Sequence, residues 1–302
     1  MMEEIYKSRS SAACISASTN YLFKNLKSIF RKMWLPILVV ALLTGFYQKE
    51  CIDLMLGVTM DKDFPGNVLF LAIWLVFLTA AAFWYEAAII SFINGRSILR
   101  NMKRLGILLL SSIGVGILLG ASCIGVFFLL RGDNSQADMG SALSSTISAL
   151  VVSVVLLILI LLLMIPLYQF MMKYLIEDKP FLPSLTQGYR EGLRHYGKIF
   201  LAILLIGIIV SVFYFIFNLP MHILIGAQTA NFNGMQMGDA SSLPSNFTLL
   251  CFLASCLGTS LLLAFCYIWT FLSLAFVYGS ITFEEQERRN MKENQQSQMT
   301  AS

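Results

Sequence analysis

The chain has 302 residues, of which 57% are hydrophobic and only 13% are charged, and its mean hydropathy is +0.74. Soluble globular proteins carry about 45–50% apolar and about 25% charged residues, so this composition excludes an ordinary soluble domain. The formal net charge of +4 gives no evidence for a nucleic acid partner, because the basic residues gather beside apolar segments, where they favour anionic lipid headgroups.

Six apolar segments are long enough to cross a hydrocarbon core of about 30 Å as helices. The expected fold is therefore all-α, a polytopic membrane protein with one six-helix transmembrane domain over residues 19–283. Residues 1–18 are expected to form a mobile cytoplasmic N-terminus, and the charged, Gln-rich tail 284–302 is expected to be cytoplasmic and largely disordered. The spans are predicted at about 27–47, 67–93, 105–130, 143–172, 198–220 and 247–281.

A basic amphipathic segment precedes the first span. In residues 19–33, apolar side chains recur every three or four positions, while Lys24, Lys27 and Arg31 face the other way. A helix of this kind lies in the plane of a bilayer surface, with its apolar side down and its cations toward the headgroups. Pro36 is expected to mark the junction between this surface helix and the span.

Glu86, at the end of the second span, is the only carboxylate well inside an apolar run. A charge inside a span is costly, so such a residue faces the bundle, becomes protonated or reaches toward the interface. One interpretation is a proton or cation site. The other is a glutamate that reaches toward the interface or pairs locally, near Arg96, Arg100 or a lysine of a lead-in. Gln169 occupies the equivalent place at the end of the fourth span, which makes it a second candidate intramembrane polar residue.

The third span follows a short basic segment and carries a stripe of small residues. Arg100, Lys103 and Arg104 are candidate headgroup contacts in this second lead-in. In the span, small residues recur every fourth position and let another helix approach closely. That helix belongs either to this chain or, less readily, to a protein partner or second copy. The residues of the stripe are Ser112, Gly116 and Gly120.

The fourth span contains Pro166, which is expected to kink it near its cytoplasmic end and to free the carbonyl of Leu162. The segment that follows is the third lead-in, and it is the most regular. Its apolar positions fall at a spacing of three to four residues from Leu185 to Phe200, and Glu191 is placed on the opposite, polar face. The candidate headgroup contacts on that polar face are Arg190, Arg194 and Lys198.

The start of this third lead-in is also predicted from its sequence. Ser184 and Gln187 have the spacing of a capping box, and Pro183 precedes them. The helix is therefore expected to begin directly after Ser184.

The distribution of cations predicts the orientation of the chain. With the amino terminus inside, 18 of the 21 Lys and Arg residues fall in inner segments, and only Lys49, Lys62 and Arg131 fall in outer ones. This asymmetry follows the positive-inside rule. Both termini are therefore expected in the cytoplasm.

The three lead-ins suggest a threefold internal repeat. A tyrosine precedes a basic residue by eleven positions at the end of each even-numbered span, in the pairs Tyr85–Arg96, Tyr168–Lys179 and Tyr278–Arg289. The alternative is that tyrosine and basic residues gather at every membrane interface in any case. The repeat is therefore a hypothesis in which one unit comprises a surface helix, an outward span and a return span.

The six-span layout, with basic lead-ins such as Tyr189 to Lys198 before the odd spans, resembles a group of bacterial integral membrane proteins. This group includes the YciC-like proteins and the membrane domain fused to some glycerophosphodiester phosphodiesterases. The resemblance covers most of the chain and implies a multi-pass protein of the bacterial cytoplasmic membrane. It carries over no catalytic residue, because the soluble phosphodiesterase domain has no counterpart in this sequence.

No arrangement of residues in the sequence indicates catalysis. The HExxH and GxSxG motifs, a phosphate-binding glycine loop and paired intramembrane aspartates are missing, and the six cysteines lack metal-ligand spacing. We therefore expect neither an enzyme nor a cofactor or metal site. The favoured hypothesis is a non-enzymatic membrane protein that binds anionic lipid headgroups or a partner through its cationic helices. The alternative is a small-solute or ion transporter with a polar route near Glu86.

Overall fold

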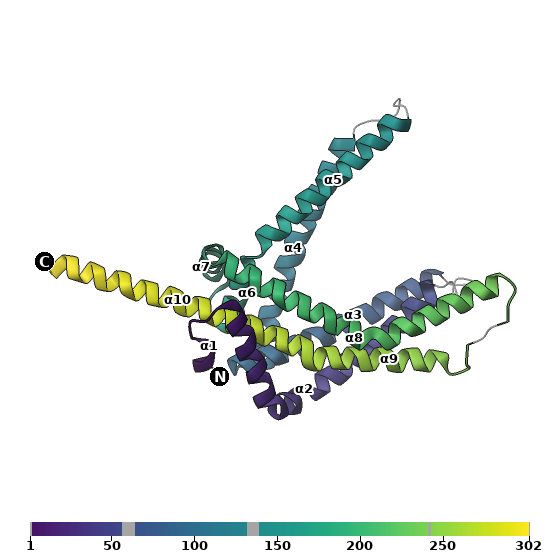
Figure 1. Cartoon of the computed structure of the whole chain (residues 1–302), viewed down its shortest axis with the longest axis horizontal. Coiled ribbons are helices and arrows are strands. Elements are labelled where there is room, and N and C mark those ends of the chain that lie inside the picture. Colours follow the sequence, from purple (N-terminus) through teal and green to yellow (C-terminus); the bar gives the residue numbers. More distant parts are fainter. Residues whose placement is uncertain (1, 56–63, 132–138, 241–242, 302) are drawn as a thin grey trace. The chain divides into compact units, whose positions relative to one another are not determined.

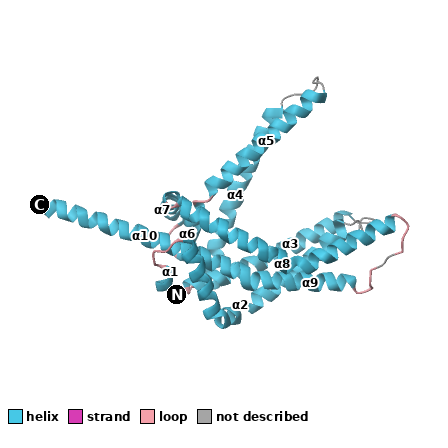
Figure 2. Cartoon of the chain, viewed as in Figure 1, coloured by secondary structure: helices cyan, strands magenta, loops and turns pink. Residues whose placement is uncertain are grey.

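The computed structural model describes residues 2–55, 64–131, 139–240 and 243–301, and every regular element in these ranges is helical (Figure 2). Figure 1 shows the order of the helices along the chain. They are α1 Met2–Ile5, α2 Ser11–Met55, α3 Phe64–Asn94, α4 Ile98–Arg131, α5 Met139–Met164, α6 Leu167–Ile176, α7 Phe181–Arg194, α8 Tyr196–Gln236, α9 Phe247–Leu261, the π-helical turn η1 Leu262–Tyr267, and α10 Ile268–Ala301.

Six helical segments of the described ranges are long and apolar enough to cross a membrane by length and composition. This confirms the predicted all-α architecture with six spans. Of the three cations predicted in outer segments, Lys62 lies outside the described residues. The six segments are Ser11–Cys51, Leu69–Asn94, Ile98–Ser122, Leu150–Ile176, Tyr196–Gln236 and Phe247–Met299.

The first two lead-ins are not separate helices. The prediction that Pro36 separates a surface helix from the first span is wrong, because α2 continues through Pro36 as one helix of 45 residues. A proline removes only one backbone hydrogen bond, and helices that span membranes tolerate it. The second lead-in is likewise the first turns of α4. Only the third forms a helix of its own, α7, which ends where His195 interrupts the helical backbone before α8.

The N-terminal residues are packed against α10, although residues 1–18 were expected to be mobile. Ile5 is completely buried, and a Cβ atom placed on Gly279 would lie 2.6 Å from its carbonyl oxygen. The backbone N–H of Arg9 donates to Ser280 Oγ (2.8 Å), which in turn donates to the Arg9 carbonyl oxygen (3.1 Å). These contacts join residues 271 positions apart, so no local pattern could have indicated them.

The C-terminal tail continues α10 as far as Ala301 instead of losing regular structure. Its side chains are almost all exposed beyond Glu285, so tertiary packing does not account for the helix. The residues from Ser280 to Ala301 include no glycine or proline and are rich in Glu, Gln, Arg, Lys and Met. These residues have high intrinsic helix propensity.

The chain divides into two compact units, of which the first comprises Met1–Met102 and Leu201–Ser302. In this unit α2 packs against α3, α9 and α10. Aromatic and small residues make these contacts close: the ring of Phe46 lies 4.6 Å from that of Phe252 and 5.4 Å from that of Trp74. Gly258 of α9 lies against the carbonyl of Phe217 in α8, where a Cβ atom would be 2.8 Å from the oxygen.

The second unit, Lys103–Phe200, is organised by a helix break at Pro166. The chain leaves α5 at Met164 and resumes as α6 at Leu167, which confirms the predicted interruption near the end of the fourth span. The carbonyl of Leu162 accepts a hydrogen bond from the backbone N–H of Ile165 (3.3 Å) and another from the hydroxyl of Tyr196 (3.2 Å). The carbonyl predicted to be freed is therefore satisfied by a distant side chain.

Candidate functional site

The α6–α7 hairpin holds the third lead-in, and small residues of α7 bring its backbone against α6. A Cβ atom on Gly188 would lie 2.5 Å from the Cα of Phe170, and one on Gly192 would lie 2.5 Å from the carbonyl oxygen of Pro166. Ser184 is also buried, so the face of α7 that docks carries a small residue at every fourth position. Such spacing allows two helices to approach closely.

The start of α7 differs from the prediction. The capping box is wrong, because α7 begins at Phe181 after Pro180, and Ser184 lies inside the first turn. The Ser184 hydroxyl donates to the carbonyl oxygen of Pro180 (2.7 Å). A proline at the entry is compatible with a helix start, since the first backbone donors of a helix have no intrahelical partner in any case.

A buried ion pair closes the same interface. Lys173 Nζ of α6 lies 2.8 Å from both carboxylate oxygens of Glu191 in α7, and the side chains are only 3% and 8% exposed. Glu191, predicted on the polar face, is therefore buried. Both groups have lost most of their water, so each depends on the other for compensation of its charge.

Docking through this small face leaves two other faces of α7 exposed. The first is apolar, with Leu182 at 70% and Leu193 at 48% exposure. The second carries the exposed cations Arg190 and Arg194. An exposed apolar face beside an exposed cationic face is typical of a helix at a membrane interface.

Arg104 differs from the other candidate headgroup contacts because its guanidinium is held by the loop between α6 and α7. It lies 3.1 Å from Asp178 Oδ1, donates to the carbonyl oxygens of Glu177 (3.0 Å) and Lys179, and stacks 4.4 Å from the ring centre of Tyr174. Arg104 therefore holds the loop between α6 and α7 in place. The candidates Lys24, Lys27, Arg31, Arg100, Lys103, Arg190 and Arg194 are exposed, and Lys198 is half-buried.

Glu86 contacts the π-helical turn η1. Tyr267, the last residue of η1, donates its hydroxyl to Glu86 Oε1 (2.5 Å), and Tyr85 donates to the carbonyl oxygen of Leu263 within the same turn (2.5 Å). Two consecutive residues of α3 thus bind both ends of a backbone irregularity, a kind often found at functional sites. The partner of Glu86 in this hydrogen bond is therefore a tyrosine of a distant segment.

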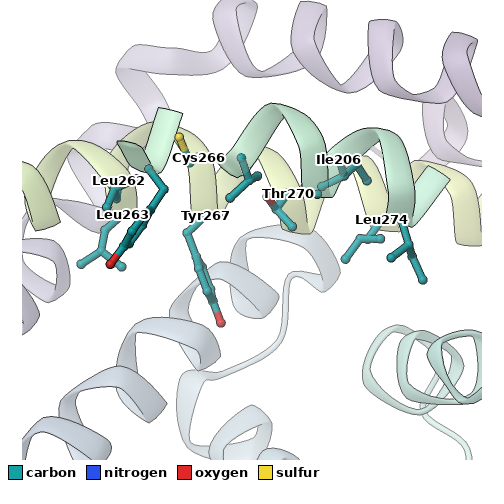
Figure 3. Close-up of a pocket in the computed structure, with 11 residues that line it drawn as sticks. Ile206, Leu262, Leu263, Cys266, Tyr267, Thr270 and Leu274 are labelled. Carbon is teal, nitrogen blue, oxygen red and sulfur yellow. The ribbon is translucent and has the colours of Figure 1, made fainter. Parts of the chain in front are cut away.

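A cavity of about 460 Å³ lies beside this turn, between η1, α10 and α8. Figure 3 shows Tyr267 extending from η1 to the opposite side from Cys266, with Leu262, Leu263 and Leu274 on the cavity wall. Among the described residues that line it, Tyr214, Tyr267 and Thr270 are those with an oxygen atom in the side chain. The volume suits a small ligand, but the wall is almost entirely apolar.

Gln169 is completely buried in α6, and neither atom of its amide group has a hydrogen-bond partner in the described part of the chain. A buried amide without a partner costs free energy, so the position favours a bound water or another polar group. Gln169 does not share the surroundings of Glu86: its neighbours on α6 are the residues against which α7 docks.

The small stripe of the third span brings no helix of the described ranges into close contact. Ser112, Gly116 and Gly120 are exposed, and a Cβ atom on either glycine would meet no atom of the described structure within 4 Å. The glycines that do bring helices together include Gly188 and Gly192. Together with Ser184 they form a stripe of small residues at every fourth position, as in the third span. The same pattern therefore occurs twice in the sequence.

Sequence reasoning missed Lys173, Tyr267 and the docking role of Gly188 and Gly192. The glycine stripe could have been found from its spacing, whereas the partners of Lys173 and Glu86 lie 18 and 181 positions away. Comparisons of the chain with protein-family profiles, with curated proteins and with solved structures found no match.

Proposed function

We propose that this multi-pass membrane protein is not an enzyme and that it binds anionic lipid headgroups through cationic helices on its cytoplasmic face. The observation that carries the proposal is the docking of α7 onto α6 by its small face. This docking leaves the apolar residues Leu182 and Leu193 and the cations Arg190 and Arg194 exposed together.

The direction of this docking matters because an amphipathic helix can also bury its apolar face inside its own protein. Here the buried positions of α7 are Ser184, Gly188, Glu191 and Gly192, and none of them belongs to the apolar stripe. The apolar residues Leu182 and Leu193 are thus exposed for contact with lipid tails, and Arg190 and Arg194 are exposed on the neighbouring face, where cations attract phosphate groups. Each cation near an anionic leaflet contributes roughly 1 kcal/mol.

The experiment removes the cations of the third lead-in. The variant Arg190→Gln/Arg194→Gln/Lys198→Gln is purified in nanodiscs that contain equal amounts of phosphatidylcholine and phosphatidylglycerol. Native mass spectrometry then counts the phosphatidylglycerol molecules that stay bound. We expect the affinity for the anionic lipid to fall by about a hundredfold, because three cations that contribute roughly 1 kcal/mol each are removed, while binding of the zwitterionic lipid is unchanged.

A matched control removes three cations from the tail, as Arg288→Gln/Arg289→Gln/Lys292→Gln. It lowers the net charge by the same amount but leaves α7 intact, so it should retain phosphatidylglycerol like the natural chain. Equal losses in both variants would show that net charge alone attracts the lipid, and normal retention in the α7 variant would contradict the proposal outright.

Transport of a small solute or ion along a polar route near Glu86 is the second candidate. The contact between Tyr267 and Glu86 at a π-helical turn supports it. The neighbouring cavity is lined almost entirely by apolar side chains, which favours hydrocarbon over a hydrated solute. Lipid binding therefore remains the better supported proposal.

We also propose the bacterial cytoplasmic membrane as the location, with both termini on the cytoplasmic side. The resemblance of the six-span layout to the YciC-like group supports the location, and the distribution of Lys and Arg supports the orientation. A homo-oligomer or partner contact at Gly116 and Gly120 is a further proposal, supported by the exposure of both residues.

A further inference from the structure

A polar hollow of about 290 Å³ lies at the N-terminal end of the chain, between the residues before α2, the first turns of α2, and α10. We name it the N-terminal hollow. In contrast to the apolar cavity beside η1, charged and hydrogen-bonding side chains line it. Those that bear on its chemistry are Glu4, Lys7, Arg9, Asn20, Tyr21 and Lys24.

The two sides of the hollow are fixed by separate contacts. On one side, the segment that carries Lys7 and Arg9 is anchored to α10 by the burial of Ile5 and by the hydrogen bonds between Arg9 and Ser280. On the other side, Asn20 and Tyr21 lie four and three residues before Lys24 on α2, so each is a neighbour of Lys24 on the helix surface. The side chains are thus arranged around a common space before any ligand arrives.

The charges in the hollow favour an anion. Among the described residues that line it, three cations accompany one carboxylate, Glu4. The Arg9 guanidinium is already engaged, since it donates to the Glu4 carbonyl oxygen (2.7 Å) and lies over the Phe276 ring. Within the described structure, the ammonium groups of Lys7 and Lys24 have no carboxylate within ion-pair distance, so both charges can serve a ligand.

We infer that the N-terminal hollow binds a phosphate monoester carried by a membrane lipid. A phosphate monoester has a charge of about −1.5 to −2 near neutral pH, which matches the balance of three cations and one carboxylate. The Lys7 and Lys24 ammonium groups, the Asn20 amide and the Tyr21 hydroxyl supply donors for its oxygens. The inference deepens the lipid-headgroup proposal and rests on it for the source of the ligand.

The test compares two anionic lipids that differ in their phosphate group. The full-length protein is placed in phosphatidylcholine nanodiscs with phosphatidic acid, a monoester, or with phosphatidylglycerol, a diester of lower charge. Lys7→Gln/Lys24→Gln is the main variant, because both side chains are exposed and their loss should not disturb packing. We expect the preference for phosphatidic acid to fall by about tenfold. Glu4→Gln removes the opposing carboxylate, so it should raise the preference.

The outcomes separate this inference from the proposal on which it rests. The α7 variant should bind both anionic lipids less well and keep its preference for phosphatidic acid. An undiminished preference in Lys7→Gln/Lys24→Gln would overturn the inference and leave the α7 proposal standing. Inorganic phosphate and glycerol phosphate are added as soluble competitors, and neither should displace the lipid at similar concentration. Displacement by either would support the phosphate site and overturn the lipid as its source.

Discussion

Lys173 and Glu191 form a buried ion pair within a helix hairpin that otherwise docks through glycines. Moving both charges out of water costs several kcal/mol per ion, and their mutual attraction offsets this cost only when the geometry is good. Here one ammonium group lies 2.8 Å from two carboxylate oxygens. We therefore expect the pair to contribute more to how α7 is positioned on α6 than to the net stability of the fold.

Removal of one partner should be more damaging than removal of both. Lys173→Met leaves the Glu191 carboxylate buried without compensation, at a cost of about 3–5 kcal/mol, and should lower the thermal unfolding temperature in detergent. Lys173→Met/Glu191→Leu replaces the pair by apolar side chains and should restore most of that loss. Lys179→Gln is the control, since Lys179 makes an ion pair with Glu177 at the surface, where such pairs contribute little. A double variant as unstable as the single one would contradict this account.

At the scale of single residues, the sequence could predict which side chains are exposed better than it could predict which side chains pair. It placed Arg190 and Arg194 on an exposed cationic face, as the structure does. It assigned Glu191 to the same face, because helical periodicity gives the direction of a side chain relative to its own helix and says nothing of what approaches from outside. The partner, Lys173, belongs to another helix.

The faces of α7 in the structure differ from the faces that its sequence pattern predicts. The pattern divides α7 into an apolar and a polar half, whereas the structure divides it into three faces: apolar, cationic and small. The small face cannot be recognised by hydrophobicity, because Ser and Gly count as neither apolar nor charged. It can be recognised by the spacing of Ser184, Gly188 and Gly192.

Enlargement of this small face should release α7 from α6. Gly188→Leu and Gly192→Leu each place side-chain atoms where the backbone of α6 already lies, at Phe170 and Pro166, so the hairpin must open. Trypsin should then cleave after Arg190 and Arg194 several times faster in membrane vesicles with the cytoplasmic face outward. Gly197→Leu is the matched control, because a Cβ atom at Gly197 meets nothing within 4 Å. Unchanged cleavage in all three variants would show that the close approach is dispensable.

Element ends were harder to predict than element types. Pro166 interrupts the fourth span, whereas Pro36 leaves α2 continuous, although both prolines occur in apolar sequence. At the break, the carbonyl of Leu162 receives a hydrogen bond from the hydroxyl of Tyr196. A hydroxyl from a distant segment thus satisfies a carbonyl that the helix break leaves exposed. The local sequence around Pro166 does not show that this hydroxyl is nearby.

At the scale of the whole molecule, apolar length alone predicted the six spans, because a bilayer requires about 20 apolar residues per crossing helix. The packing of Ile5 and Arg9 on α10 and the hollow lined by Lys7 and Lys24 were not predictable in this way. Both depend on contacts between the two ends of the chain. The membrane requires runs of apolar residues that are continuous in the sequence, whereas the candidate sites combine residues from distant segments.

The orientation of the whole molecule is the prediction on which both lipid proposals depend. An even number of spans places both termini on one side, and the excess of Lys and Arg in the corresponding segments predicts that this side is cytoplasmic. In a bacterial host, green fluorescent protein fused after Ser302 should fluoresce, and alkaline phosphatase inserted after Ser245 should be active. The exchanged fusions, with phosphatase after Ser302 and fluorescent protein after Ser245, are the controls and should be silent. Active phosphatase after Ser302 would put α7 and the N-terminal hollow outside the cell. Their cations would then face away from the anionic inner leaflet that they are proposed to bind.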